Sequence, residues 1–376
     1  MELKKSALQL RDTGEVIPLG IVESIMYAAT LAPSGRNGQP WRWQLLQNSV
    51  RLLCTDPETL TDYRHCGALA GLGAALENLI LAAHHHQLEI SIDVFPDPSD
   101  ASYVADIGFY RNPTHGTEPH EYDELYGSLR ERCTNRKLGD GQPLEPSALS
   151  SIEAAAKSIP GTNVRLHTSR SVVDDLANIM GCAGSLQLFD EHFHRELVSE
   201  LRWTAEEAER TRDGIDVETL ELTTSDRFGL TLAKSWTFAQ ALRRVGGSKV
   251  IERLFAKPVR ASAAFGLIWR DESDPKDYLL GGRAMERAWL RTSQLGLSIY
   301  PVSTLPYFFA RLIRGNGIGM SKRMRNGVQR LRARYSEHFA VTDRSGEIIS
   351  FCIMRSGPVS KRALRKPLEQ VVEIIE

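Results

Sequence analysis

The first part of the chain alternates between segments with helical and with strand periodicity. Apolar residues at helical spacing over 21–32 predict a helix, which a Pro-Ser-Gly turn ends. Residues 67–88 are apolar nearly all the way round, which predicts a helix buried on most sides and suited to a domain interface. Runs of β-branched and aromatic residues between turn residues predict strands at 51–55, 89–95 and 103–110.

A polar segment from Pro113 to Asp123 carries two prolines and a glycine and is the candidate domain boundary. The order of elements then starts again, with a helix, a strand and a long helix predicted at 146–158, 163–168 and 172 to about 200. The charged, helix-prone residues 201–260 have no clean apolar face, and we interpret them as an insertion. Beyond them we predict strands at 263–270, 296–303 and 347–354 and an amphipathic helix at 277–295. This pattern predicts an α+β protein with domains at 1–123 and 124–376.

Composition narrows the function to small-molecule chemistry. The 376 residues exceed the size at which one hydrophobic core usually stops growing, which favours two domains. Lys plus Arg number 46 against 47 Asp plus Glu, so no overall charge favours nucleic acid or an anionic membrane as partner. The five cysteines are scattered without a C-x-x-C pair, and no N-terminal apolar region or long apolar run is present. We expect a soluble, cytoplasmic protein.

The segment Ala32–Trp43, APSGRNGQPWRW, is a candidate polar cradle. It places Ser34, Asn37 and Gln39 around a glycine-containing turn. Such a turn can aim backbone N–H groups and short side chains at a planar heterocycle or a phosphate, because glycine lets the backbone approach closely. The alternative is an ordinary surface loop anchored by its two tryptophans.

The segment Leu129–Leu138, LRERCTNRKL, gathers Arg130, Arg132, Arg136 and Lys137 around Thr134. Guanidinium groups bind phosphate with two parallel hydrogen bonds, and a hydroxyl between them is a further donor. The alternative is a solvated charged surface.

Together the two segments resemble the nitroreductase family of FMN flavoproteins, which carry an Arg-rich R-R-S-x-R stretch and an A-P-S-x-x-N-x-Q-P-W loop. The loop matches in full, and the Arg stretch is present from Arg132 to Arg136 with cysteine and threonine at its second and third positions. The resemblance implies FMN as cofactor. It also implies that these cofactor-binding residues come from the two segments: Pro33, Ser34, Gly35, Asn37, Gln39, Arg132, Thr134 and Arg136.

The order of the motifs is reversed relative to the family, since the loop precedes the Arg stretch. Family members are usually homodimers in which each FMN takes the loop from one subunit and the Arg stretch from the other. Here the first half carries the loop and the second half the Arg stretch. The chain therefore resembles the Acg-like subgroup, which implies two tandem nitroreductase-like halves forming a pseudo-dimer with one FMN, as a monomer or a weak homo-oligomer.

The resemblance implies two further cofactor-binding segments. The segment 296–303 matches the place where the family presents backbone N–H groups to flavin N5, which implicates Pro301, Val302 and Ser303. The basic segment before the C-terminal apolar tail implicates Arg365 in binding the phosphate. The insertion at 201–260 corresponds to a helical lid over the flavin.

Other candidate motifs indicate no metal site and no dinucleotide fold. The consecutive residues His84, His85 and His86 point in different directions on a helix, and His192 and His194 have no facing carboxylate pair. The glycine-rich segments lack the spacing of a dinucleotide fingerprint. We therefore predict no metal ligand, and NAD(P)H only as a transient electron donor to the flavin.

The leading hypothesis is an oxidoreductase that passes hydride or electrons through flavin N5 to or from a nitroaromatic, a quinone or another conjugated small molecule. FMN carries that chemistry, so we assign no catalytic side chain. The alternative is a non-enzymatic FMN-binding or storage protein whose lid blocks NAD(P)H. Dehydrogenation of a peptide or azoline product is a third possibility.

Overall fold

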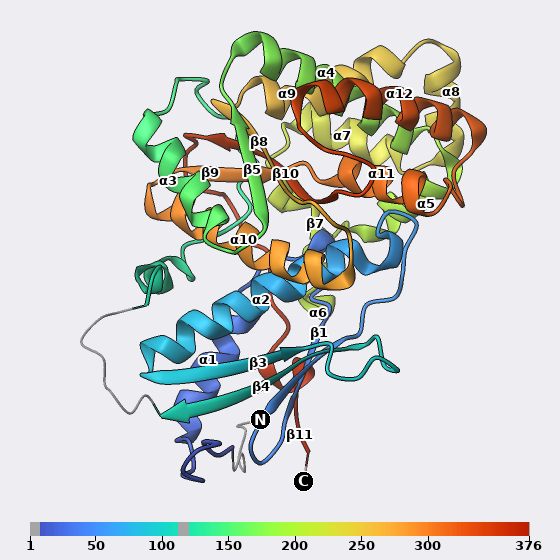
Figure 1. Ribbon diagram of the computed structural model, residues 1–376. Helices are drawn as coiled ribbons and strands as arrows, with labels where there is room; N and C mark the ends of the chain where they lie inside the picture. Colours follow the sequence, from blue (N-terminus) through green and yellow to red (C-terminus); the bar gives the residue numbers. More distant parts are fainter. Residues whose placement is uncertain (1–7, 112–119, 376) are drawn as a thin grey trace.

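The computed structural model describes residues 8–111 and 120–375, which form two β-sheets flanked by helices (Figure 1). The first sheet has the strand order β11-β1-β2-β4-β3. All of its pairings are antiparallel except that β11, at the C-terminal end of the chain, runs parallel to β1. The C-terminal tail therefore completes the sheet of the N-terminal half. The strands are β1 (Trp41–Leu45), β2 (Val50–Cys54), β3 (Leu88–Val94), β4 (Tyr103–Arg111) and β11 (Val372–Ile374).

The second sheet is antiparallel throughout, with the order β5-β8-β10-β9. Every residue of β8 and β10 is buried, because helices cover both faces of the sheet. A short parallel pair, β6-β7, lies within the insertion. The strands are β5 (Thr162–His167), β6 (Leu201–Arg202), β7 (Ile215–Asp216), β8 (Ala264–Arg270), β9 (Ser298–Pro301) and β10 (Gly346–Met354).

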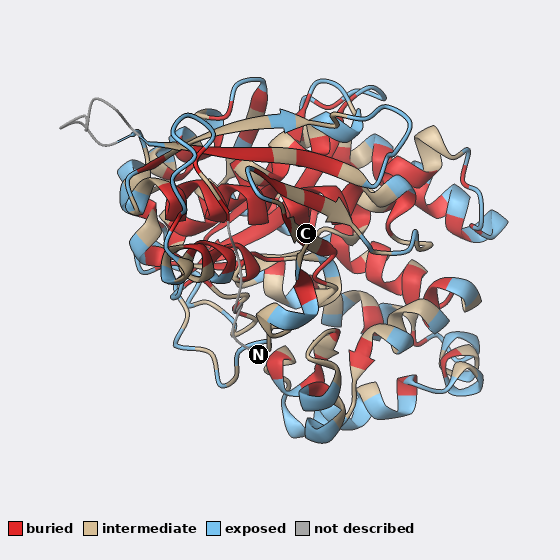
Figure 2. Cartoon of the chain, turned by 90° about the horizontal axis from the view of Figure 1, so that it is seen from below, coloured by how far each residue is buried: buried red, intermediate tan, exposed pale blue. Residues whose placement is uncertain are grey.

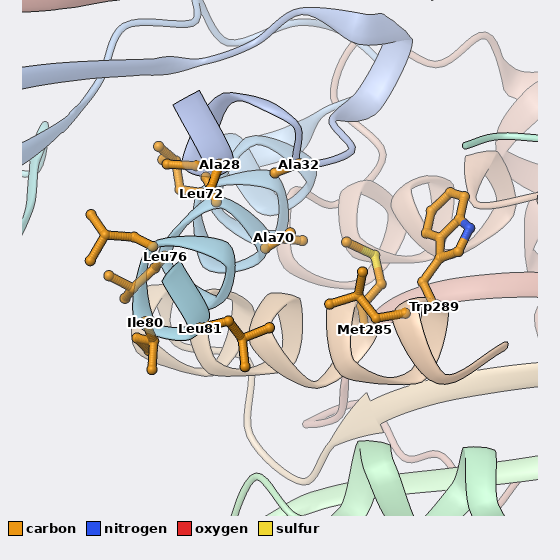
Figure 3. Close-up of a cluster of buried hydrophobic side chains, with 14 of the residues drawn as sticks. Ala28, Ala32, Ala70, Leu72, Leu76, Ile80, Leu81, Met285 and Trp289 are labelled. Atoms are coloured by element: carbon orange, nitrogen blue, oxygen red, sulfur yellow. The ribbon is translucent and has the colours of Figure 1, made fainter. Parts of the chain in front are cut away.

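Two long helices, α2 (Cys66–His85) and α10 (Pro275–Gln294), pack against each other between the sheets (Figure 1). Gly73 and Gly282 allow the close approach, since a Cβ at either position would lie 1.9 or 2.0 Å from a carbonyl oxygen of the other helix. Figure 3 shows the apolar cluster around them, with Met285 and Trp289 of α10 near side chains of α2. Although α2 is long and apolar enough to span a membrane, its apolar window is wholly buried, as in a core helix.

The remaining helices surround this core, and their exposed faces lie at the periphery (Figure 2). They include α6 to α9, which make the insertion helical as predicted. The α-helices are α1 (Leu19–Thr30), α3 (Pro146–Lys157), α4 (Arg170–Leu188), α5 (Glu191–Glu200), α6 (Ala205–Thr211), α7 (Thr224–Ala233), α8 (Trp236–Arg244), α9 (Ser248–Arg260), α11 (Thr304–Arg314), α12 (Lys322–His338) and α13 (Leu368–Val371). The 3-10 helices are η1 (Gly35–Asn37), η2 (Tyr63–His65), η3 (Asp123–Ser128) and η4 (Val217–Leu220).

The mixed helices and sheets confirm the predicted α+β class, and most predicted elements lie within a few residues of the observed ones. The single long helix predicted from residue 172 is wrong, because the chain turns extended at Asp190 and starts α5 there. Strands β1, β6, β7 and β11 and helices α11, α12 and α13 were not predicted. Most of the boundary segment Pro113–Asp123 lies outside the described residues, and the division at 123/124 stays a prediction.

Candidate functional site

The loop after α1 is a tight polar turn with an unusual backbone. Arg36, Asn37 and Gln39 all have left-handed φ values, of 47°, 56° and 54°. Non-glycine residues adopt this conformation rarely and at an energetic cost, which is most often met at functional sites. The Ser34 hydroxyl accepts a hydrogen bond from the Gln39 N–H at 3.0 Å, which closes the turn. Trp41, buried at the start of β1, then anchors the end of the loop.

The C-terminal tail is bonded onto this loop. The Asn37 amide donates to the Leu364 carbonyl at 3.0 Å, and the Arg365 guanidinium donates to Asn37 Oδ1 at 2.8 Å. The backbone N–H of Lys366 donates to Gln39 Oε1 at 2.8 Å. Two segments from opposite ends of the sequence therefore form one hydrogen-bonded polar unit, in which Gln39 is only 2% exposed.

Two arginines converge on the C-terminal end of α1. Arg365 donates to the carbonyls of Thr30 and Ala32, each at 3.0 Å, while Arg132 donates to the Leu31 carbonyl at 2.6 Å. The last carbonyls of a helix have no partners within the helix, and the helix dipole makes this end negative. The predicted Arg stretch therefore reaches the predicted loop, as does the C-terminal arginine.

The positive charges of these two arginines are only partly balanced by carboxylates. Nε of Arg132 lies 3.2 Å from a carboxylate oxygen of Glu286, and both side chains are buried. Arg365 has no carboxylate partner among the described residues. Burial, and then the positive charge of Arg132, lower the pKa of Arg365 to about 9. Arg132 and Arg365 therefore bring two positive charges to the end of α1, against the one carboxylate of Glu286.

Thr134 and Arg136 lie beside the second sheet. Thr134 forms a parallel bridge with Ile299 of β9, which fixes the Arg stretch next to the predicted segment 296–303. The Arg136 guanidinium donates to the Thr219 carbonyl and hydroxyl, both at 3.3 Å. Burial lowers the pKa of Arg136, which makes no ion pair with any carboxylate in the part of the chain that the structure describes.

The backbone N–H groups available at the end of β9 and just after it are limited. Pro301 has no N–H, and the Val302 N–H donates to the Ser350 carbonyl at 2.8 Å as part of the sheet. Ser303 is the N-cap residue of α11, whose first N–H groups have no partners within the helix. A backbone donor from this segment would therefore come from Ser303 or the start of α11.

Residues of the insertion contact the cradle directly. The Gln39 amide donates to the Arg212 carbonyl at 2.7 Å, and Arg212 Nε donates to the Arg365 carbonyl at 2.7 Å. With the contact between Arg136 and Thr219, the insertion contacts three candidate residues. Arg212, Thr219, Lys366 and Glu286 were missed in the sequence, because neither their spacing nor their composition signals such distant partners.

Pro33 and Gly35 complete the cradle, and neither has a polar side-chain atom. A Cβ at Gly71 of α2 would lie 3.3 Å from Ser34 Cβ and 3.5 Å from the Pro33 carbonyl, so the loop lies directly on α2. A Cβ at Gly35 would meet nothing within 4 Å. The loop is thus supported from one side and open above Gly35.

No family model matches the chain. Among curated proteins it is 28% identical over 300 residues to the uncharacterized protein MT1398 of Mycobacterium tuberculosis strain CDC 1551, covering 80% of this chain and 41% of that protein. It is 27% identical over 208 residues to "Putative NAD(P)H nitroreductase acg" of M. tuberculosis strain H37Rv, covering 53% of this chain and 58% of that protein. The chain spans about half the length of the curated relatives it matches.

Solved structures give distant likenesses. A nitroreductase with bound FMN from Bacteroides fragilis NCTC 9343 is 10% identical, with a TM-score of 0.36 over 65% of this chain and 95% of that one. A nitroreductase from Desulfitobacterium hafniense DCB-2, also with bound FMN, is 11% identical. Its TM-score is 0.34, and the match covers 67% of this chain and 98% of that one. The chain is thus similar to proteins named putative NAD(P)H nitroreductases, at 27% identity over about half of its length.

Proposed function

We propose that the chain binds one FMN at this cradle and acts as an oxidoreductase of the nitroreductase type. The observation that carries the proposal is the excess of positive charge where Arg132 and Arg365 meet at the end of α1, with Glu286 as the one carboxylate paired with them among the described residues. Buried cations without counter-ions are costly, and a phosphate dianion would offset that cost.

The residues present fit FMN. Arg132 and Arg365 would hold the phosphate, with Thr134 and Arg136 as further donors from the same stretch. Pro33, Ser34, Gly35, Asn37 and Gln39 would line the ring, held rigid by the bonds from Leu364 and Lys366. Pro301, Val302 and Ser303 would approach it from the second sheet.

When bound, FMN supplies reversible hydride transfer at N5, so the protein needs no acid or nucleophile of its own. The work of this chain is to bind and orient the cofactor. The N–H groups at the start of α11 would stabilise negative charge that develops on the ring. We propose a conjugated small molecule, nitroaromatic or quinone-like, as substrate and NAD(P)H as transient electron donor.

We further propose that residues 1–123 and 124–376 are two nitroreductase-like halves and that 201–260 is a lid. The packing of α2 on α10 supports this division, as does the supply of the loop and the Arg stretch by different halves. A fused interface lowers the need for a homodimer.

The free state of all five cysteines agrees with a cytoplasmic location.

The second candidate function is FMN storage without turnover. It is favoured by the hydrogen bonds of Arg212 and Thr219, which attach the insertion to Gln39 and Arg136 of the cradle. The two functions differ in whether NAD(P)H reduces the bound flavin.

The proposal is tested by FMN titration, followed by quenching of flavin fluorescence. In the double variant R132A/R136A we expect FMN affinity to fall at least about 100-fold, because each charge-assisted phosphate contact contributes about 1.5 to 3 kcal/mol. The matched control is R344A, whose guanidinium is 77% exposed and pairs with Glu272. Wild-type affinity in the double variant would overturn the site.

A further inference from the structure

The three consecutive histidines at the end of α2 have three different surroundings. His84 Nδ1 lies 2.9 Å from Asp123 Oδ1, and His86 Nε2 lies 2.9 Å from the Ser24 hydroxyl. The His85 ring stacks on Tyr126 with centroids 3.9 Å apart. The triplet therefore does not gather around one point, but His84 meets a second histidine from elsewhere in the chain.

His84 lies against His120 and Glu89. The two imidazole rings are stacked with centroids 4.0 Å apart, and His120 Nε2 lies 2.8 Å from Glu89 Oε1. One ligand atom from each of the three side chains lies within 4.8 Å of the others. We propose that His84, Glu89 and His120 form a binding site for one divalent transition metal such as zinc.

The ligand types and spacing suit this metal. Zinc binds histidine nitrogen and carboxylate oxygen at about 2.0 to 2.2 Å, and tetrahedral geometry places its ligand atoms about 3.4 Å apart. The ligand atoms of the three side chains lie within 4.8 Å of one another, so they would have to approach each other by about 1.4 Å or less to reach the tetrahedral spacing. Because the two imidazole rings are stacked, binding one ion requires the His120 ring to turn away from His84, and its 47% exposure leaves room for that rotation. Three protein ligands leave a fourth position for water.

Asp123 supplies the outer support that metal-bound histidines usually have. Its Oδ1 faces His84 Nδ1, while its Oδ2 accepts the backbone N–H of His120 at 2.9 Å. A carboxylate at Nδ1 holds the proton there and leaves Nε2 of His84 as the free electron-pair donor. Asp123 thus orients both the side chain of His84 and the backbone that carries His120.

The charges agree with a dication. Glu89 and Asp123 contribute two negative charges beside two imidazoles that are neutral when they act as ligands. The competing explanation is a pair of hydrogen bonds between protonated histidines and carboxylates, which needs no metal. Stoichiometric metal binding separates the two explanations.

This site is separate from the FMN cradle. His84 lies at the C-terminal end of α2, thirteen residues beyond Gly71, which contacts the loop, and this is about 20 Å along a helix. A bound metal would attach residues 120–123 to the end of α2 and the start of β3. Its role would be to fix the connection between the proposed halves.

The test is zinc binding to the full chain, without a polyhistidine tag and after treatment with a chelator, by calorimetry with zinc chloride. We expect one zinc per chain, and an affinity at least ten-fold lower in H84A and in H120A. H192A is the matched control, because His192 is exposed on α5, away from the cluster. It should bind zinc as the wild type does.

A second readout is the melting temperature with and without zinc. We expect zinc to raise it in the wild type and in H192A but not in the double variant H84A/H120A. No stoichiometric binding by the wild type, or equal zinc affinity in wild type and double variant, would overturn the site. FMN binding is measured in the same samples, and its loss would count against the proposed function without bearing on the metal.

Discussion

Two glutamates are fully buried where α2 packs on α10, and their surroundings differ sharply. Glu77 accepts hydrogen bonds from Arg283, at 2.7 Å, and from Arg287. Neither oxygen of Glu286 accepts a well-formed hydrogen bond from the described residues, although Arg132 Nε is 3.2 Å away. Burial raises the pKa of Glu286 to about 7, although the charge of Arg132 opposes the increase.

The free-energy cost of ionising Glu286 in the folded protein follows from this pKa. An unfolded glutamate titrates near 4.5, so ionising Glu286 costs more in the folded protein. The cost is absent below pH 4.5, grows between pH 4.5 and 7, and is complete above pH 7. At about 1.4 kcal/mol per pH unit it reaches about 3 kcal/mol. Since glutamine mimics the protonated acid, E286Q should stabilise the protein by less than about 1 kcal/mol at pH 5 and by about 3 kcal/mol at pH 8.

The assay is urea denaturation of flavin-free wild type and variants at pH 5 and pH 8, followed by tryptophan fluorescence, because the pKa of Glu286 applies to the protein without a bound phosphate. The control E77Q should lower the free energy of unfolding by about 3 to 5 kcal/mol at both pH values, because it removes the counter-charge of Arg283 and Arg287. The reasoning is refuted if E286Q is less stable than wild type at pH 8. A difference that does not change with pH would refute it equally.

Two further predictions concern the helix interface and the insertion. G73A should lower the free energy of unfolding by about 1 to 3 kcal/mol or more, because its methyl group would meet the Leu279 carbonyl oxygen. In the same urea titration G20A, on α1 with open space around it, should be neutral or stabilising, and equal effects of both variants would contradict the packing argument. R212A should speed reduction of the bound flavin by NAD(P)H in stopped-flow absorbance, because it loosens the insertion from Arg365. Unchanged or slower reduction would contradict a gating role for the insertion.

The periodicity of the sequence predicted the elements that form the two sheets and the central helices, but missed several whose patterns are weak. Strand β1 lies inside the loop motif, so its alternating Trp41 and Trp43 were interpreted as anchors of a loop. Helix α12 is rich in arginine and has a low content of apolar residues, and α11 carries a proline in its first turn. The break before α5 depends on a single extended residue, Asp190.

The residues of the candidate site were predictable only where they belong to a motif that is continuous in the sequence. The loop and the Arg stretch were visible in the sequence, and the structure brings Arg132 and Arg365 together at the end of α1. Glu286 was not predictable, because a single glutamate on an amphipathic helix gives no sign of which face it occupies. The partners of His84 were hidden for a related reason, since contacts between distant segments are not encoded in spacing.

The central claim is that this chain binds FMN in the cradle and exchanges electrons through it. The most direct test is the visible spectrum of the purified full chain under anaerobic conditions, before and after NADH or NADPH is added. We predict flavin bands that bleach on addition of nicotinamide, whereas bands that bleach only with dithionite would favour storage. A colourless protein that cannot be reconstituted with FMN would contradict the account.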